Sequence, residues 1–147
     1  MSAHTLVPEP VRHEPADGEF VLTEATTVGA EAGFPNAASW FRASVGAATG
    51  LPLADGDPAT AGISFVTDAA LPDEGYALTV TPNGVRVASS TDAGAFYGAQ
   101  TLRQLLGPAA FRRGPVSPGP WAVPAGVTTD EPRFPWRGCL LDVARHF

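Results

Sequence analysis

The residues best suited to chemistry lie at the C-terminal end of the chain. Asp142, Arg145 and His146 stand in or directly after an apolar run that begins at Cys139. An arginine held on a strand presents planar, paired hydrogen-bond donors in a rigid frame. A carboxylate in an apolar run needs a partner, so we expect Asp142 to pair structurally or to support a ligand-binding group. His146 should point away from Arg145, because consecutive strand residues face opposite sides, which favours packing or hydrogen bonding over catalysis.

Two acidic pairs, Asp73-Glu74 and Asp130-Glu131, are the other candidates for catalysis. Paired carboxylates perform general acid and base chemistry when a rigid element holds them in a cleft. The first pair precedes a predicted hairpin and the second lies in a predicted linker. We interpret both as solvated turn carboxylates, and we expect no catalytic residue within this chain.

Composition excludes several kinds of site. All nine basic residues are arginine, so a Schiff-base lysine and a phosphate-loop lysine are absent. The net charge of −6 argues against a nucleic-acid partner. Cys139 is the only cysteine, so we expect a buried, inert thiol and no disulfide or thiolate zinc centre. We predict no metal, no cofactor and no membrane partner.

The N-terminal residues are polar and contain proline, without the apolar stretch of a secretory signal. The sequence therefore predicts a cytoplasmic protein, or a secreted one whose signal peptide has been removed. We expect residues 1–18 to form a flexible segment.

Hydrophobic periodicity then predicts the elements that must position any site. The pattern predicts strands over 20–23, continuing through 26–28, and over 62–67, with a helix over 36–49 that Asn36 caps and Gly50 ends. Ser90, Thr91 or Asp92 should cap a second helix over 92–106. Gly94 and Gly98 in that helix indicate close packing against a sheet, because glycine is a poor helix former. A last strand is predicted over 121–127, followed by a linker over 128–132.

Two alternating runs, 76–81 and 85–89, flank Pro82-Asn83-Gly84. Asn-Gly between such runs predicts a two-residue type I′ turn, in which Val80 faces Val87. Leu78, Val80, Val85 and Val87 should then share one face, and the helix over 92–106 should cover it.

These elements predict an α+β fold with a small antiparallel or mixed sheet and two helices on one face. The run over 137–146 differs in kind, because continuous apolar runs are typical of strands buried on both faces. We expect it to be an isolated strand that opens a second domain. Residues after about Pro132 should therefore be poorly anchored, or lie against the first domain or a neighbouring chain.

Two groups of segments resemble one enzyme family. Residues 75–80, 84–87 and 93–106 resemble the N-terminal, non-catalytic domain of β-N-acetylhexosaminidases of glycoside hydrolase family 20. Pro132–Gly138 and Leu141–Phe147 resemble the first strand of the catalytic barrel in the same enzymes. The resemblance covers residues 15–147 and implies a zincin-like leading domain over 19–131, followed over 132–147 by a linker and the first strand of a truncated (β/α)₈ barrel.

The resemblance also implies an activity and a substrate. Arg145 matches the family arginine that binds the 3- and 4-hydroxyls of a terminal N-acetylhexosamine in glycans or chitooligosaccharides. Catalysis in the family is retaining and substrate-assisted, because the acetamido oxygen of the substrate attacks the anomeric carbon. The Asp-Glu pair that supports this attack lies past residue 147, so this chain alone should be inactive. The partners implied are the glycan, through the missing domain, and the barrel itself.

Other interpretations stay open on the residues alone. The chain could be the leading domain of a related O-GlcNAc hydrolase or α-glucuronidase. It could also be a stand-alone carbohydrate-binding or structural module, for which Trp121 and Trp136 are the candidate exposed aromatics.

Overall fold

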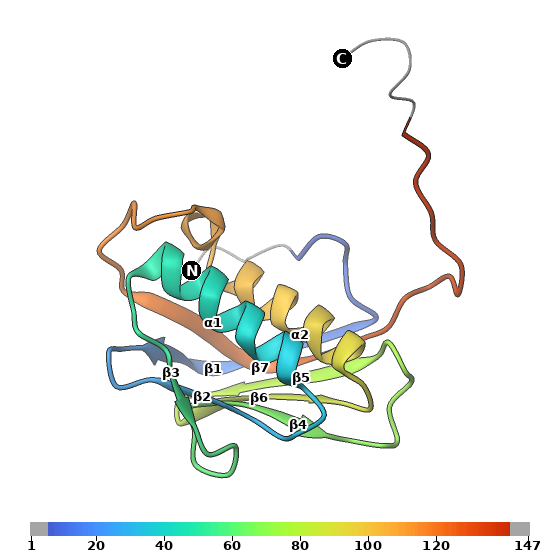
Figure 1. The fold of residues 1–147 in the computed structure, drawn as a ribbon, viewed down its shortest axis with the longest axis horizontal. Coiled ribbons are helices and arrows are strands. Elements are labelled where there is room, and N and C mark those ends of the chain that lie inside the picture. Colours follow the sequence, from blue (N-terminus) through green and yellow to red (C-terminus); the bar gives the residue numbers. More distant parts are fainter. Residues whose placement is uncertain (1–5, 142–147) are drawn as a thin grey trace.

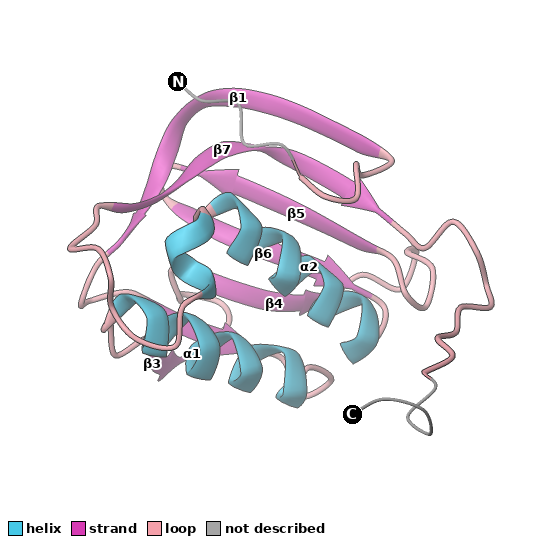
Figure 2. Ribbon diagram, turned by 90° about the horizontal axis from the view of Figure 1, so that it is seen from above, coloured by secondary structure: helices cyan, strands magenta, loops and turns pink. Residues whose placement is uncertain are grey.

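The computed structural model describes residues 6–141, which fold into a two-layer arrangement of one sheet and two helices (Figure 1). The strands are β1 (Arg12–Leu22), β2 (Thr27–Ala30), β3 (Ala54–Gly56), β4 (Ile63–Thr67), β5 (Tyr76–Thr81), β6 (Gly84–Ser89) and β7 (Trp121–Asp130). The helices are α1 (Pro35–Thr49), α2 (Asp92–Leu105) and the short 3₁₀ helix η1 (Pro108–Phe111). Figure 2 shows α1 and α2 side by side over the same face of the sheet. The predicted α+β class and the placement of both helices are therefore confirmed.

The sheet has seven strands in the order β1-β7-β5-β6-β4-β2-β3. One half is antiparallel, because β7 pairs with β1 and β5, and β5 pairs with β6. The other half, from β6 through β4 and β2 to β3, is parallel. The prediction left antiparallel and mixed sheets open, and the structure shows a mixed sheet.

The β5–β6 hairpin shows the predicted buried face with a different register. Val80 pairs with Val85, and Thr81 pairs with Gly84, so the two loop residues are Pro82 and Asn83. The predicted register was wrong because it would pair Pro82 with Val85, and proline has no N–H to donate to the ladder. The correction moves each partner by two residues, which preserves the side of the sheet. Leu78, Val80, Val85 and Val87 accordingly remain together in the core.

Two strands are longer than the sequence predicts. β1 starts earlier in the chain, and β7 ends later. β1 begins at Arg12, and Arg12–Pro15 pair with β7 ahead of an irregularity between Pro15 and Glu19, so residues 12–18 belong to a strand and not to a flexible segment. β7 continues to Asp130 between β1 and β5, so residues 128–130 belong to the sheet and not to a linker. A turn at Thr23–Thr26 separates β1 from β2. Strand pairing depends on the neighbouring strand, so polar and proline-containing segments can be recruited against local propensity.

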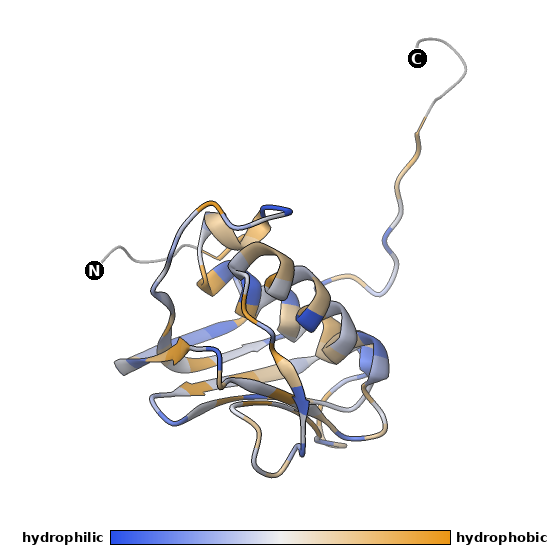
Figure 3. Cartoon of the chain, turned by 60° about the vertical axis from the view of Figure 1, so that its left-hand side comes forward, coloured by the Kyte–Doolittle hydropathy of each residue, from blue (hydrophilic) through white to orange (hydrophobic). Residues whose placement is uncertain are grey.

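The hydrophobic core lies between the helices and the sheet. It is formed by apolar residues from both helices and from most strands. Its largest fully buried side chains are Phe34, Phe41, Phe65, Leu53, Ile63, Leu78 and Leu102. In Figure 3 the helices carry mainly hydrophobic colours with a few hydrophilic positions. No helix within residues 6–141 has the length and hydropathy to cross a membrane.

One aspartate ties the N-termini of the two helices together. Asp92 is the first residue of α2, and its Oδ1 accepts a hydrogen bond from Ala37 N of α1 at 3.0 Å. Its Oδ2 accepts from Asn36 Nδ2 at 2.7 Å. α1 begins at Pro35, and the residue before it, Phe34, makes no side-chain cap. Asn36 lies inside the first turn, so the prediction that it caps this helix was wrong. Thr91 caps α2 by accepting from Gly94 N, which is one of the three predicted possibilities.

We expect Asp92→Ala to lower the free energy of unfolding by about 1–2 kcal/mol, because the change leaves donors at the start of α1 without their acceptor. Urea denaturation followed by circular dichroism measures this loss. Asp68→Ala is the matched control, because Asp68 accepts a local hydrogen bond from Ala70 N in a loop. Equal stabilities of the two variants would contradict the role given to Asp92.

Candidate functional site at the exit from the sheet

The predicted site residues lie at and beyond the end of the described chain. Arg145, Asp142 and His146 are outside the described residues. The run that precedes them is described as far as Leu141, and residues 137–141 do not form a strand. Leu140 and Leu141 are 96% and 69% exposed, as expected for a run with no place in the first domain.

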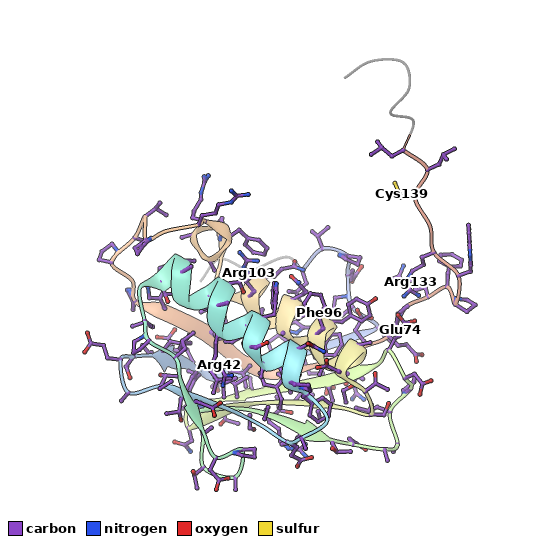
Figure 4. All side chains as sticks on the ribbon, viewed as in Figure 1. Arg42, Glu74, Phe96, Arg103, Arg133 and Cys139 are labelled. Carbon is purple, nitrogen blue, oxygen red and sulfur yellow. The ribbon has the colours of Figure 1, made fainter. Side chains whose placement is uncertain are left out.

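Cys139 is also exposed, so the prediction of a buried thiol was wrong. The segment around it leads away from the sheet and the helices (Figures 1 and 4). A strand needs a hydrogen-bonded neighbour, and burial needs a covering element. The described part of the chain supplies neither at this point.

The segment just before this run is held against the domain. We call residues 131–137 the exit segment, and Glu74, Tyr97 and Arg137 the exit cluster. Arg137 Nη2 donates to Glu74 Oε1 at 2.5 Å and lies 3.4 Å from Tyr97 OH. Tyr97 OH also donates to Glu74 Oε1 at 3.2 Å. The loop before β5, helix α2 and the exit segment therefore meet in one hydrogen-bonded group.

The cluster changes the titration of its members. The hydrogen bond from Arg137 is the largest cause that lowers the pKa of Glu74 below its ordinary value, and desolvation of the carboxylate opposes it. The same hydrogen bond raises the pKa of Arg137. Glu74 is therefore ionised and paired, not simply solvated as the sequence analysis expected, and it is poorly suited to act as a general acid near neutral pH.

Arg137→Gln should raise the pKa of Glu74 toward 4.5, because the change removes the largest cause of its depression. The pair contributes to stability above this ordinary pKa, and the contribution is lost as the pH falls through the depressed value. An NMR pH titration of the Glu74 carboxyl carbon measures the shift. Arg12→Gln is the control, because Arg12 pairs with Glu14 inside β1. A Glu74 midpoint that does not move in Arg137→Gln would rule out the pairing.

A pocket of about 390 Å³ lies beside the exit cluster. α2 forms one wall, the exit segment forms a second, and an N-terminal segment around Pro8 and Glu9 forms a third. The lining residues are Pro8, Glu9, Glu74, Tyr76, Tyr97, Gln100, Thr101, Gln104, Asp130, Glu131, Pro132, Arg133, Phe134 and Arg137. Tyr76 OH and Thr101 Oγ1 lie 2.6 Å apart in its buried wall. Burial raises the pKa of Tyr76 to about 12, so the phenol stays neutral.

Two segments from opposite parts of the sequence, around residues 7–9 and the exit segment, line this pocket. Gln104 holds the N-terminal segment through two hydrogen bonds of 3.0 Å, since its side chain accepts from Val7 N and donates to Val7 O. Arg133 Nη2 donates to Glu9 O at 3.2 Å, which joins the exit segment to the N-terminal segment. Figure 4 shows Glu74 and Arg133 at the same end of the domain. The arrangement is suited to anchoring chain segments.

Across residues 6–141, no group of three or more His, Cys, Asp or Glu side chains could hold a metal ion. Asp130 accepts a hydrogen bond from Val11 N at 3.0 Å and so supports the pairing of β1 with β7. The sequence analysis assigned no function to Arg137 and did not single out Tyr97. No local pattern could have found their contact, because Glu74, Tyr97 and Arg137 are far apart in the chain.

Comparison with known proteins gives a consistent set of relatives. The profile described as glycosyl hydrolase family 20, domain 2, matches residues 3–131. A β-hexosaminidase of Porphyromonas gingivalis is 37% identical over 97% of this chain and 19% of its own length. A β-N-acetylhexosaminidase of Cellulomonas fimi is 32% identical over 97% of this chain and 29% of its own length.

A solved structure with the same fold adds to these matches. The Streptomyces plicatus N-acetyl-β-hexosaminidase in complex with Thio-NAglucal superimposes with a TM-score of 0.87 at 34% identity. The superposition covers 98% of this chain and 29% of that structure. The chain thus spans between about a seventh and a third of the length of the first relatives that it matches.

Proposed function

The chain belongs to glycosyl hydrolase family 20, in which it corresponds to domain 2, and on this basis we propose that it is the N-terminal part of a β-N-acetylhexosaminidase. The proposed reaction is hydrolysis of terminal non-reducing N-acetylhexosamine residues from glycans or chitooligosaccharides. The observation that carries the proposal is the alignment of 97% of the chain with the N-acetylhexosaminidase of Cellulomonas fimi, which is more than three times longer.

The proposed mechanism is retaining and substrate-assisted, and it assigns the chemistry to residues outside this chain. The acetamido oxygen of the substrate attacks the anomeric carbon, while an Asp-Glu pair on a later barrel strand orients the acetamido group and protonates the leaving group. Arg145 binds the 3- and 4-hydroxyls of the terminal sugar. Asp142 and His146 support the first barrel strand by pairing and packing.

The role of the present domain is structural in this proposal. The proposal makes its α+β fold one of the zincin-like type, with the exit segment leading into a (β/α)₈ barrel. Four large apolar side chains near the end of the chain support packing against that barrel, because they are strongly exposed in the described residues: Phe134, Trp136, Leu140 and Leu141. Contiguous exposed apolar groups are typical of surfaces that a further domain covers.

The first test is the reading frame beyond codon 147. We expect several hundred further codons that encode an Asp-Glu pair on a later strand of a barrel. The longer protein should release 4-nitrophenol from 4-nitrophenyl N-acetyl-β-D-glucosaminide with retention of the β anomer, and the 147-residue chain should not. A stop codon directly after Phe147, or a longer protein that does not cleave this substrate, would overturn the proposal. Retention of the chain alone on a chitooligosaccharide resin would instead favour a carbohydrate-binding module.

A further inference from the structure

Two arginines four residues apart fasten the exit segment to the domain. Arg133 reaches the backbone of Glu9, and Arg137 reaches the side chains of Glu74 and Tyr97. Arg137 also donates from Nη1 to Phe134 O at 2.6 Å, which closes a turn inside the exit segment. One guanidinium therefore fixes both the local shape of this segment and its place against α2.

Anchoring stops directly after Arg137. Residues 138–141 have no polar side chain except the Cys139 thiol, and Leu140 is 96% exposed. Arg137 is therefore the last strong hydrogen-bonding side chain before Asp142. Arg145 lies eight positions after Arg137, a span of at most about 29 Å in a fully extended chain. A fixed point at Arg137 thus limits where Asp142 and Arg145 can enter a second domain.

The geometry points to Arg137 as a positioning residue: we propose that its contacts with Glu74, Tyr97 and Phe134 O set the register in which the segment carrying Asp142 and Arg145 leaves the first domain. The inference rests on the proposed function, since that function gives Arg145 its substrate. A planar guanidinium can serve three acceptors in fixed directions, whereas a lysine ammonium is a flexible point charge. The ion pair between Arg137 and Glu74 is also partly exposed, with 41% of the Arg137 side chain accessible. Removing this pair should therefore leave the fold intact.

A first experiment uses Cys139, the only cysteine of the chain, as a label site two residues after Arg137. A nitroxide on Cys139 of the 147-residue chain should show restricted motion by electron paramagnetic resonance. In Arg137→Gln its rotational correlation time should fall at least twofold, with an unchanged circular dichroism spectrum. Tyr97→Phe should give a smaller fall. Arg12→Gln, which breaks an exposed arginine–glutamate pair within β1, should give none. An Arg137→Gln spectrum equal to that of Arg12→Gln would overturn the proposal.

A second experiment measures the consequence in the longer protein. We expect Arg137→Gln to raise KM about tenfold with a smaller change in kcat, because Arg145 would be displaced from the sugar hydroxyls while the distant acid chemistry stays in place. Arg137→Lys should recover only part of the loss, and Arg12→Gln should match the unmodified protein. If the unmodified longer protein is inactive, the proposed function fails, while the label experiment still decides whether Arg137 fixes the exit segment. An active protein whose KM does not change in Arg137→Gln would overturn the inference.

Discussion

Gly94→Ala should lower the free energy of unfolding by about 2–3 kcal/mol, although alanine is the better helix former by about 1 kcal/mol. A Cβ atom at this position would lie 2.3 Å from both Gly75 O and Ser89 Oγ. Ser89 Oγ itself donates to Gly75 O at 2.7 Å in the core, so neither atom can move without breaking a buried hydrogen bond. α2 would have to shift away from the sheet that it covers.

Urea denaturation of both proteins measures this effect. Gly33→Ala is the control, because no heavy atom lies within 4 Å of the Cβ position there. Gly98→Ala tests the same surface one turn later, where a Cβ would meet the buried Val87 Cγ1 at 2.6 Å. We expect Gly98→Ala to cost less than Gly94→Ala, because a side-chain methyl yields more easily than a backbone carbonyl. A Gly94→Ala variant as stable as the unmodified protein would show that α2 does not pack this closely.

Arg145→Met in the longer protein should lower kcat/KM between about a hundredfold and ten-thousandfold. The proposed role gives this arginine two hydrogen bonds to sugar hydroxyls, and each hydrogen bond from a charged group contributes about 1.5–3 kcal/mol. A loss of about 1.4 kcal/mol corresponds to a factor of ten in rate. Arg145→Lys should recover little of the activity, because an ammonium lacks the planar pair of donors.

Steady-state assays with 4-nitrophenyl N-acetyl-β-D-glucosaminide measure this loss. Arg86→Met is the control, because Arg86 is exposed on β6 of the first domain. The control should keep the activity of the unmodified protein. If Arg145→Met retained kcat/KM within twofold of that value, Arg145 would not be a substrate ligand.

Two of the corrections found in the structure share one cause. β7 recruited the polar residues 12–18 into β1, and Asp92 of α2 took over the capping that Asn36 was expected to provide. Each depends on a partner that is not adjacent in the chain. Local propensity cannot weigh such partners, because it describes only neighbours along the sequence.

The sequence by itself determined the features that depend on local order. Alternation in 76–89 identified the buried face of the hairpin, and the spacing of apolar residues in 92–106 identified the helix that covers it. Gly94 and Gly98 indicated the close approach of that helix, because only a packing requirement explains two poor helix formers there. Segments spread over both the domain and the exit segment identified the family.

Only the tertiary structure decided how the end of the domain is built. Glu74 and Arg137 are 63 residues apart in the chain, and they meet because β5 and β7 are antiparallel neighbours, so that the start of β5 lies beside the end of β7. The pocket beside them forms because the N-terminal segment and the exit segment return to α2 together. Such contacts arise from the folding of the whole sheet, and no pattern of residues within one segment contains them.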